Sequence, residues 1–222
     1  MSKFPKTDRT KLKRIPDRGQ YSRKAIYKII DEALVCHVGF VIDDQPFIIP
    51  TLHARMSDEL ILHGAKASRM LRHVGAGQPV SVAITLLDAL VLARSVFHHS
   101  VNYRSVVIFG KGRPIEEPGA KMEALRAVSA KIMPGRWSDA RQPSDKELDA
   151  TAVVAIPLQE ASAKVRGGPP GDDPADLDLP VWAGVLPLKL QPGTPENAPN
   201  LPEGIVLPDY IRRCIRNWQP SS

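Results

Sequence analysis

Residues 59–71, ELILHGAKASRML, join a run of strand-forming residues to the start of a helix. Gly64, Lys66, Ser68 and Arg69 meet at that junction, together with the free amide groups of the helix start. A phosphate dianion is bound well by this combination of a small residue, a hydroxyl group, cations and free amides. Two cations at a helix start oppose the helix dipole unless an anion is present, so the stretch predicts a phosphate site. The alternative is an ordinary capped surface helix whose cations are solvated.

The segments around this junction predict mostly strands. Three segments predict a β-meander that leads into it, at residues 35–42, 46–56 and 59–64. After a short helix at residues 68–74, further strands are predicted at residues 79–87, 89–97, 101–115 and 151–166, where Pro157 marks an edge or a bulge. Other helices are predicted at residues 22–34, 118–132 and 144–149. Strands in succession without βαβ units predict a mainly β fold, an antiparallel β-barrel with peripheral helices.

Length and charge set the domain organisation. The 222 residues are enough for one core, and we expect a basic arm at 1–20, one domain at 21–190 and a proline-rich tail at 191–222 that packs on the body or a partner. The net charge of +6 is concentrated in residues 1–24, which hold nine Lys or Arg and two Asp. We favour an arm that lies over the body or a partner subunit, with nucleic-acid binding as the alternative.

Several other classes of protein are disfavoured. Apolar runs are strand-sized and no secretory signal is present, so we expect no membrane span. Cys36 and Cys214 lie far apart, which fits a reducing cytoplasm. Adjacent residues of a strand point to opposite faces, so His98 and His99 cannot chelate one ion, and we predict no metal site.

Three segments together resemble the FMN-binding split-barrel superfamily: FIIPTLHAR at 47–55, ELILHGAKASRML at 59–71 and VNYRSVVIFGKG at 101–112. The resemblance is greatest to the nitroimidazole-resistance proteins, and pyridoxamine phosphate oxidase is a more distant relative. It covers residues 14–190 and implies a split β-barrel that binds FMN through its phosphate. The cofactor-binding residues that it implies are Pro50, Thr51, His63, Lys66, Ser68, Arg69, Thr85, Tyr103, Ser105, Lys164 and Trp182.

The resemblance also assigns roles to some of these residues. Ser68 and Arg69 match the pair that holds the flavin phosphate, and Lys66 stands in for a lysine that the oxidases have where this chain has Met70. Trp182 resembles a late tryptophan that reaches the flavin across a dimer interface, or else it is an aromatic core anchor. By position, His53 or His63 is the analogue of a histidine near the flavin.

No side chain in the sequence can accept a hydride, so redox chemistry requires a cofactor. We therefore expect a homodimer, with the flavin near the subunit interface, that reduces a small electrophilic acceptor with nicotinamide-derived electrons. The alternative is a flavin- or haem-binding module without turnover. Oxidation of vitamin B6 is not expected, because the tail LPDYIRRCIRNWQ at 207–219 lacks the expected arginine and histidine pattern.

Overall fold

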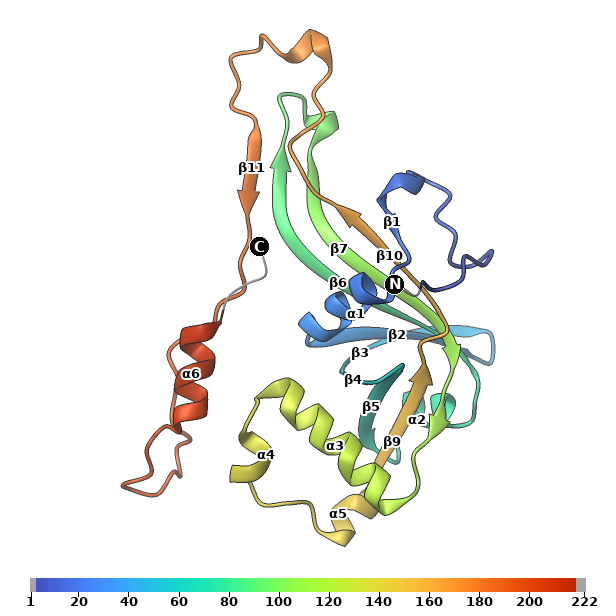
Figure 1. The fold of residues 1–222 in the computed structure, drawn as a ribbon, viewed down its shortest axis with the longest axis vertical. Coiled ribbons are helices and arrows are strands. Elements are labelled where there is room, and N and C mark those ends of the chain that lie inside the picture. The colour runs from blue at the N-terminus through green and yellow to red at the C-terminus, as the bar shows by residue number, and fades with distance from the viewer. Residues whose placement is uncertain (1–2, 219–222) are drawn as a thin grey trace.

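The computed structural model describes residues 3–218. Its strands form two antiparallel sheets with helices around them (Figure 1). The larger sheet has the order β1 (Gly19–Gln20), β10 (Glu160–Arg166), β7 (Ser100–Lys111), β6 (Pro79–Leu92), β2 (Val35–Ile42) and β3 (Gln45–Leu52), and β11 (Gly184–Pro187) also pairs with β6. The smaller sheet has the order β4 (Ala54–Met56), β5 (Glu59–Ala65), β9 (Thr151–Pro157) and β8 (Arg113–Pro114). The predicted fold class, mainly antiparallel β with peripheral helices, is confirmed.

Six α-helices lie within the described residues: α1 (Arg23–Glu32), α2 (Arg69–Gly75), α3 (Pro118–Ile132), α4 (Arg136–Asp139), α5 (Asp145–Ala150) and α6 (Asp209–Asn217). Ser22 and Ser68 cap α1 and α2, because each hydroxyl oxygen accepts a hydrogen bond from a backbone N–H in the first turn. Ser144 and Glu147 form the predicted capping box of α5. The helices predicted from periodicity are therefore confirmed to within a few residues.

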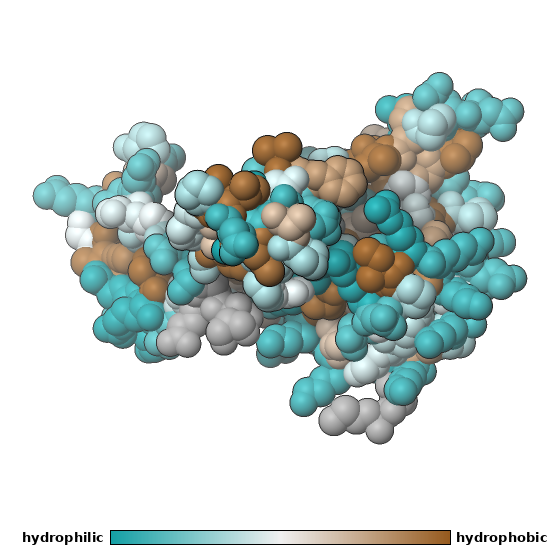
Figure 2. Space-filling model, turned by 90° about the horizontal axis from the view of Figure 1, so that it is seen from above, coloured by the Kyte–Doolittle hydropathy of each residue, from teal (hydrophilic) through white to brown (hydrophobic). Residues whose placement is uncertain are grey.

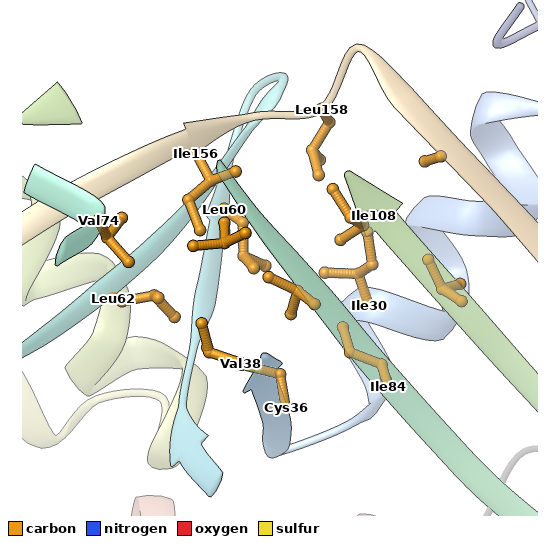
Figure 3. Close-up of a cluster of buried hydrophobic side chains, with 14 of the residues drawn as sticks. Ile30, Cys36, Val38, Leu60, Leu62, Val74, Ile84, Ile108, Ile156 and Leu158 are labelled. Carbon is orange, nitrogen blue, oxygen red and sulfur yellow. The ribbon is translucent and has the colours of Figure 1, made fainter. Parts of the chain in front are cut away.

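The main core lies between the two sheets and is covered by α1 and α2. Figure 3 shows its centre, where side chains from both sheets, α1 and α2 meet: Ile30, Cys36, Val38, Leu60, Leu62, Val74, Ile84, Ile108, Ile156 and Leu158. A smaller cluster lies under α3 and includes Ile61, Val128 and Val153. Because Leu60 and Leu62 join the first cluster and Ile61 the second, β5 is buried on both faces.

The predicted strands differ from the structure in four places. Residues 79–87 and 89–97 are not two strands, because β6 runs on through Asp88 with a register shift between Leu87 and Ala89. This bulge absorbs the polar residue without ending the strand. The predicted strand 46–56 is divided at His53 into β3 and β4, which belong to different sheets.

The other two differences also occur where the chain changes sheets. The predicted strand 151–166 is divided after Pro157 into β9 and β10, and the predicted strand 101–115 is divided at Gly112 into β7 and β8. A Cβ atom on Gly112 would lie 2.3 Å from Val74 Cγ1 and 3.1 Å from the Val74 carbonyl oxygen. Only glycine leaves room for the chain to pass α2 at this point.

The N-terminal segment is ordered by docking on the body. Phe4 is buried, and its backbone N–H donates to the Tyr21 carbonyl oxygen at 2.8 Å. The Tyr21 hydroxyl donates to the Thr10 carbonyl oxygen at 3.1 Å, and Arg9 forms an ion pair with Glu160 of β10. The division of the chain into an arm, a domain and a tail stays a prediction. Between residues 3 and 218, no helix has the length and apolar character needed to cross a membrane.

Candidate functional site

At the junction between β5 and α2, Arg69 has no anionic partner among residues 3–218. The Ser68 hydroxyl accepts from the Leu71 N–H at 3.4 Å, which starts the helix. The exposed Arg69 guanidinium lies 4.3 Å from the centre of the Phe47 ring in β3. Within residues 3–218, Arg69 forms no hydrogen bond or ion pair with another side chain. Its five N–H groups are therefore available to an anion.

Gly64 has a packing role at this junction. A Cβ atom there would lie 3.1 Å from Leu71 Cδ1, closer than is usual for such a contact. The absence of a side chain therefore lets α2 lie close against β5. The sequence predicts that this glycine allows the close approach of a phosphate, whereas in the structure it allows the close packing of a helix.

Five of the predicted site residues share the outer face of the larger sheet. Thr85 is paired with Ser105, and Ser105 is paired with Lys164, so these residues form one row across β6, β7 and β10. Residues directly opposite each other on antiparallel strands project to the same face, as do residues two apart on one strand. Tyr103 lies on this face because it is two residues before Ser105 on β7. Pro50 lies on it too, because Pro50 is paired with His37 of β2, His37 is paired with Ala83 of β6, and Ala83 is two residues before Thr85.

Thr51 projects to the opposite face of β3 from Pro50. It is paired with Cys36, a core residue, and it is four residues from Phe47 on the same side of the strand. It therefore lies about 13 Å along β3 from the point where Arg69 packs. The strand β3 thus has Thr51 and the Arg69 contact on one face and Pro50 on the other.

His63 lies on the far side of the smaller sheet from α2. It is paired with Val153 of the cluster under α3, and it lines a cleft of about 480 Å³ between α3, α4 and α5. The other lining residues are Leu125, Val128, Ser129, Ile132, Met133, Arg136, Trp137, Arg141, Pro143, Glu147 and Thr151. Its buried Nδ1 atom has no hydrogen-bond partner among the described residues. Burial lowers the pKa of His63, so the neutral imidazole is favoured.

Lys66 and His53 interact with other parts of the fold. The charge of Lys66 adds to burial, the larger cause, in lowering the pKa of Lys121 in α3. His53 is buried with its Nε2 atom 2.9 Å from the Ile30 carbonyl oxygen, and burial lowers the pKa of this histidine too. This contact gives His53 a structural role between α1 and the two sheets.

Trp182 is 66% exposed and lies beside Gly184 at the start of β11. Gly184 is paired with Leu92 of β6, seven residues and about 23 Å along the strand from Thr85. Within one chain, Trp182 is therefore not brought to the Thr85 row. The exposure shows that it is not an anchor of this chain's own core.

Sequence reasoning missed two features. Arg104 donates to the carboxylates of both Glu32 and Asp88, with Nη2 2.7 Å from an oxygen of each. The sequence signal for this interaction was Asp88 within an apolar strand, because a half-buried carboxylate needs a hydrogen-bonding or charged partner. The second feature is the cleft beside His63, to which the loop PGRWSDARQP at 134–143 contributes Trp137 and two arginines.

Comparisons with known proteins bear on the family and the fold of this chain. Residues 22–165 match the family model described as pyridoxamine 5'-phosphate oxidase. No curated protein is similar enough in sequence to count as a match. The flavocytochrome Anf3 from Azotobacter vinelandii superposes with a TM-score of 0.88 at 36% identity, over 93% of this chain and 96% of that one.

Two further solved structures are similar. The FAD and haem binding protein from Mycobacterium smegmatis has a TM-score of 0.85 at 35% identity, over 88% of this chain and 96% of that one. A proposed 5-nitroimidazole antibiotic resistance protein from Bacteroides thetaiotaomicron has a TM-score of 0.57 at 22% identity, over 66% of this chain and 86% of that one, which shows a shared fold. From the match over residues 22–165 and these relatives, the chain belongs to the pyridoxamine 5'-phosphate oxidase family.

Proposed function

We propose that this protein binds a flavin through its phosphate and works as a redox protein. The observation that carries the proposal is the Arg69 guanidinium, which lies over Phe47 without an anionic partner among the described residues. A guanidinium group binds a phosphate by paired, charge-assisted hydrogen bonds. The two relatives above 30% identity are a flavocytochrome and an FAD and haem binding protein, which supports the same assignment.

The residues present fit such a cofactor. Arg69 and the Ser68 hydroxyl would hold the phosphate, and Thr51 lies further along β3 on the same face as the Arg69 contact, whereas Pro50 lies on the opposite face. A bound flavin would supply hydride acceptance and electron transfer, which no side chain of this protein offers. The part of the protein is to bind the phosphate, orient the ring and exclude water.

We further propose that two copies meet at the sheet face that carries Thr85 and Ser105, with the flavin near their interface. Nicotinamide-derived electrons would then reduce a small electrophilic acceptor. FMN is the flavin expected from the sequence, and FAD is the one bound by the relative from Mycobacterium smegmatis. A cytoplasmic location stays a prediction.

The test begins with purified protein stripped of any bound cofactor. FMN and FAD are added separately, and absorption between about 350 and 500 nm is recorded with the dissociation constant of each flavin. Uptake of either flavin supports the proposal, and the ratio of the two constants identifies the preferred one. A protein that binds neither contradicts it. Oxidation of NADH or NADPH with a panel of quinones and nitro compounds then tests turnover.

A second candidate function, haem binding, is favoured by the cleft beside His63. A buried Nδ1 atom without a partner is costly, and a neutral imidazole is the form that ligates haem iron. Leu125, Val128 and Met133 give the cleft an apolar lining that suits the faces of a porphyrin. Here His63 would hold the haem iron, and the apolar residues would exclude water.

The haem proposal is tested with His63→Gln and with His98→Gln, a control at the tip of the β6–β7 hairpin. Each protein is titrated with haemin, and the Soret band is recorded in the oxidised and reduced states. We expect His63→Gln to lose the spectrum of histidine-ligated haem while His98→Gln retains it. The same spectrum in both variants, or no uptake by the parent protein, would remove His63 as the ligand.

A further inference from the structure

Residues 188–206, here called the C-terminal arm, follow a path away from the body of the protein (Figure 1). Every residue of the arm is exposed. At its start, Pro187 of β11 is paired with Ala89, and the Leu188 N–H donates to the Asp88 carbonyl oxygen at 2.9 Å. The arm therefore leaves the larger sheet from a fixed point.

The other end of the arm is also held. In α6, the Tyr210 hydroxyl donates to the Asp139 carboxylate at 2.7 Å, and Arg136 Nη1 donates to the Tyr210 hydroxyl at 3.1 Å. Tyr210 also lies against Gly135, so α6 is docked on the turn that begins α4. Both ends of the arm are therefore held, while the side chains between them are exposed.

The arm presents large apolar side chains to solvent. Leu190, Ile205 and Val206 are 71%, 57% and 73% exposed. In Figure 2 the left-hand lobe, where Figure 1 places α6 and the end of the arm, carries brown apolar surface among polar side chains. Large apolar side chains on an ordered segment are stabilised only when another surface covers them.

The total surface area shows how much is left uncovered. The chain exposes 14,075 Å², whereas a compact monomer of 24.4 kDa exposes about 10,000 Å². Obligate dimers bury about 2,000 to 5,000 Å² in total, which is about 1,000 to 2,500 Å² from each chain. The surplus of about 4,000 Å² on this chain therefore exceeds what one chain contributes to a permanent interface, and it leaves ample surface for a partner to cover.

The same chain offers a second apolar surface that would suit the arm. On the outer face of β2 and β3, Val41, Ile48 and Leu52 are exposed, Ile48 to 73%. A two-fold axis brings two such complementary surfaces together twice, so that both are covered in one step. A second copy of this chain therefore accounts for both surfaces without another protein.

We propose that the C-terminal arm of each copy lies against the outer face of β2 and β3 of the other copy. The inference rests on the homodimer in the proposed function and adds the segment that holds it together. The arm contributes apolar contacts from Leu190, Ile205 and Val206, and Ile48 is the residue on the partner face that loses most exposure. The dimer is then held by the arms as well as by the face that carries Thr85 and Ser105.

The test uses the full chain with Val206→Asp on the arm and Ile48→Asp on the sheet face. The matched control is Asn200→Asp, which adds the same charge to an exposed position of the arm without removing an apolar side chain. A buried aliphatic side chain contributes about 10- to 100-fold to binding, and a two-fold interface carries each substitution twice. We therefore expect dimer dissociation constants, from analytical ultracentrifugation, to rise by about 10²- to 10⁴-fold for Val206→Asp and Ile48→Asp.

Circular dichroism should be unchanged in all three variants, because each substituted side chain is exposed within its own chain. A monomeric parent protein would overturn the inference, and so would a Val206→Asp dimer as tight as the Asn200→Asp control. If Ile48→Asp dissociated and Val206→Asp did not, the arm's role would be overturned, whereas the proposed homodimer itself would still stand. Flavin absorption is recorded on the same samples, so that the two proposals are tested separately. If the parent protein is a colourless dimer and Val206→Asp dissociates it, the result supports the role of the arm and contradicts flavin binding.

Discussion

Substitution of Arg69 by alanine should weaken flavin binding by about 10- to 150-fold. A hydrogen bond to a charged group contributes about 1.5 to 3 kcal/mol, which corresponds to that change in the dissociation constant. The effect on folding should be small, because the guanidinium is exposed and contacts only the Phe47 ring among the described side chains. An exposed cation–π contact contributes about 0.5 to 1 kcal/mol, which is about 1 to 4 °C in melting temperature for a chain of this size.

The matched control is Arg72→Ala, which removes another exposed arginine from α2 one turn further on. It lowers the positive charge of the helix by the same amount, so it measures the long-range electrostatic contribution alone. Arg69→Lys provides a second comparison, since it keeps the charge and loses the planar fork of donors. We expect the affinity for flavin to decrease in the order parent, Arg69→Lys, Arg69→Ala, with Arg72→Ala close to the parent.

The assay is titration of cofactor-free protein with FMN and FAD, followed by the quenching of flavin fluorescence at two salt concentrations. Equal losses in Arg69→Ala and Arg72→Ala would show that Arg69 acts only through its net charge. An unchanged affinity in Arg69→Ala would remove this residue from the site. A loss accompanied by a large fall in melting temperature would indicate a structural cause instead.

Three further predictions concern stability. Ser68→Ala should lower the free energy of unfolding by about 0.5 to 2 kcal/mol, because the cap of α2 is lost; an unchanged denaturation midpoint would contradict that role. Burial raises the pKa of Cys36 to about 12 from 9.0, so between these values the unfolded thiol loses its proton while the folded thiol keeps it. Relative to Cys36→Ala, the parent should therefore lose about 1.4 kcal/mol of stability per pH unit above pH ~9, and parallel pH profiles in urea would refute this. Gly112→Ala places a Cβ atom 2.3 Å from Val74 Cγ1, so α2 must shift. The free energy of unfolding, measured by chemical denaturation, should fall by about 1 to 3 kcal/mol. A denaturation curve like that of the parent would show that α2 moves without cost.

Much of the local structure could be predicted because it depends on short-range interactions. The Ser22 and Ser68 caps and the capping box of Ser144 and Glu147 each join groups within four residues of one another, so their spacing is visible in the sequence. The strands were harder to delimit. Whether Asp88 ends a strand depends on its half-buried contact with Arg104, sixteen residues away, which no local pattern encodes.

The sequence by itself determined the class of fold, the order of most elements and the candidate phosphate segment, because periodicity, capping residues and charge at a helix start act locally. Only the tertiary structure decided which of the candidate residues meet. It placed Arg69 against Phe47 and His63 in a separate cleft on the other face of the smaller sheet, although the two residues are only six apart. The physical reason is that successive residues of a strand project to opposite faces, and what covers each face is set by chain segments far away in the sequence.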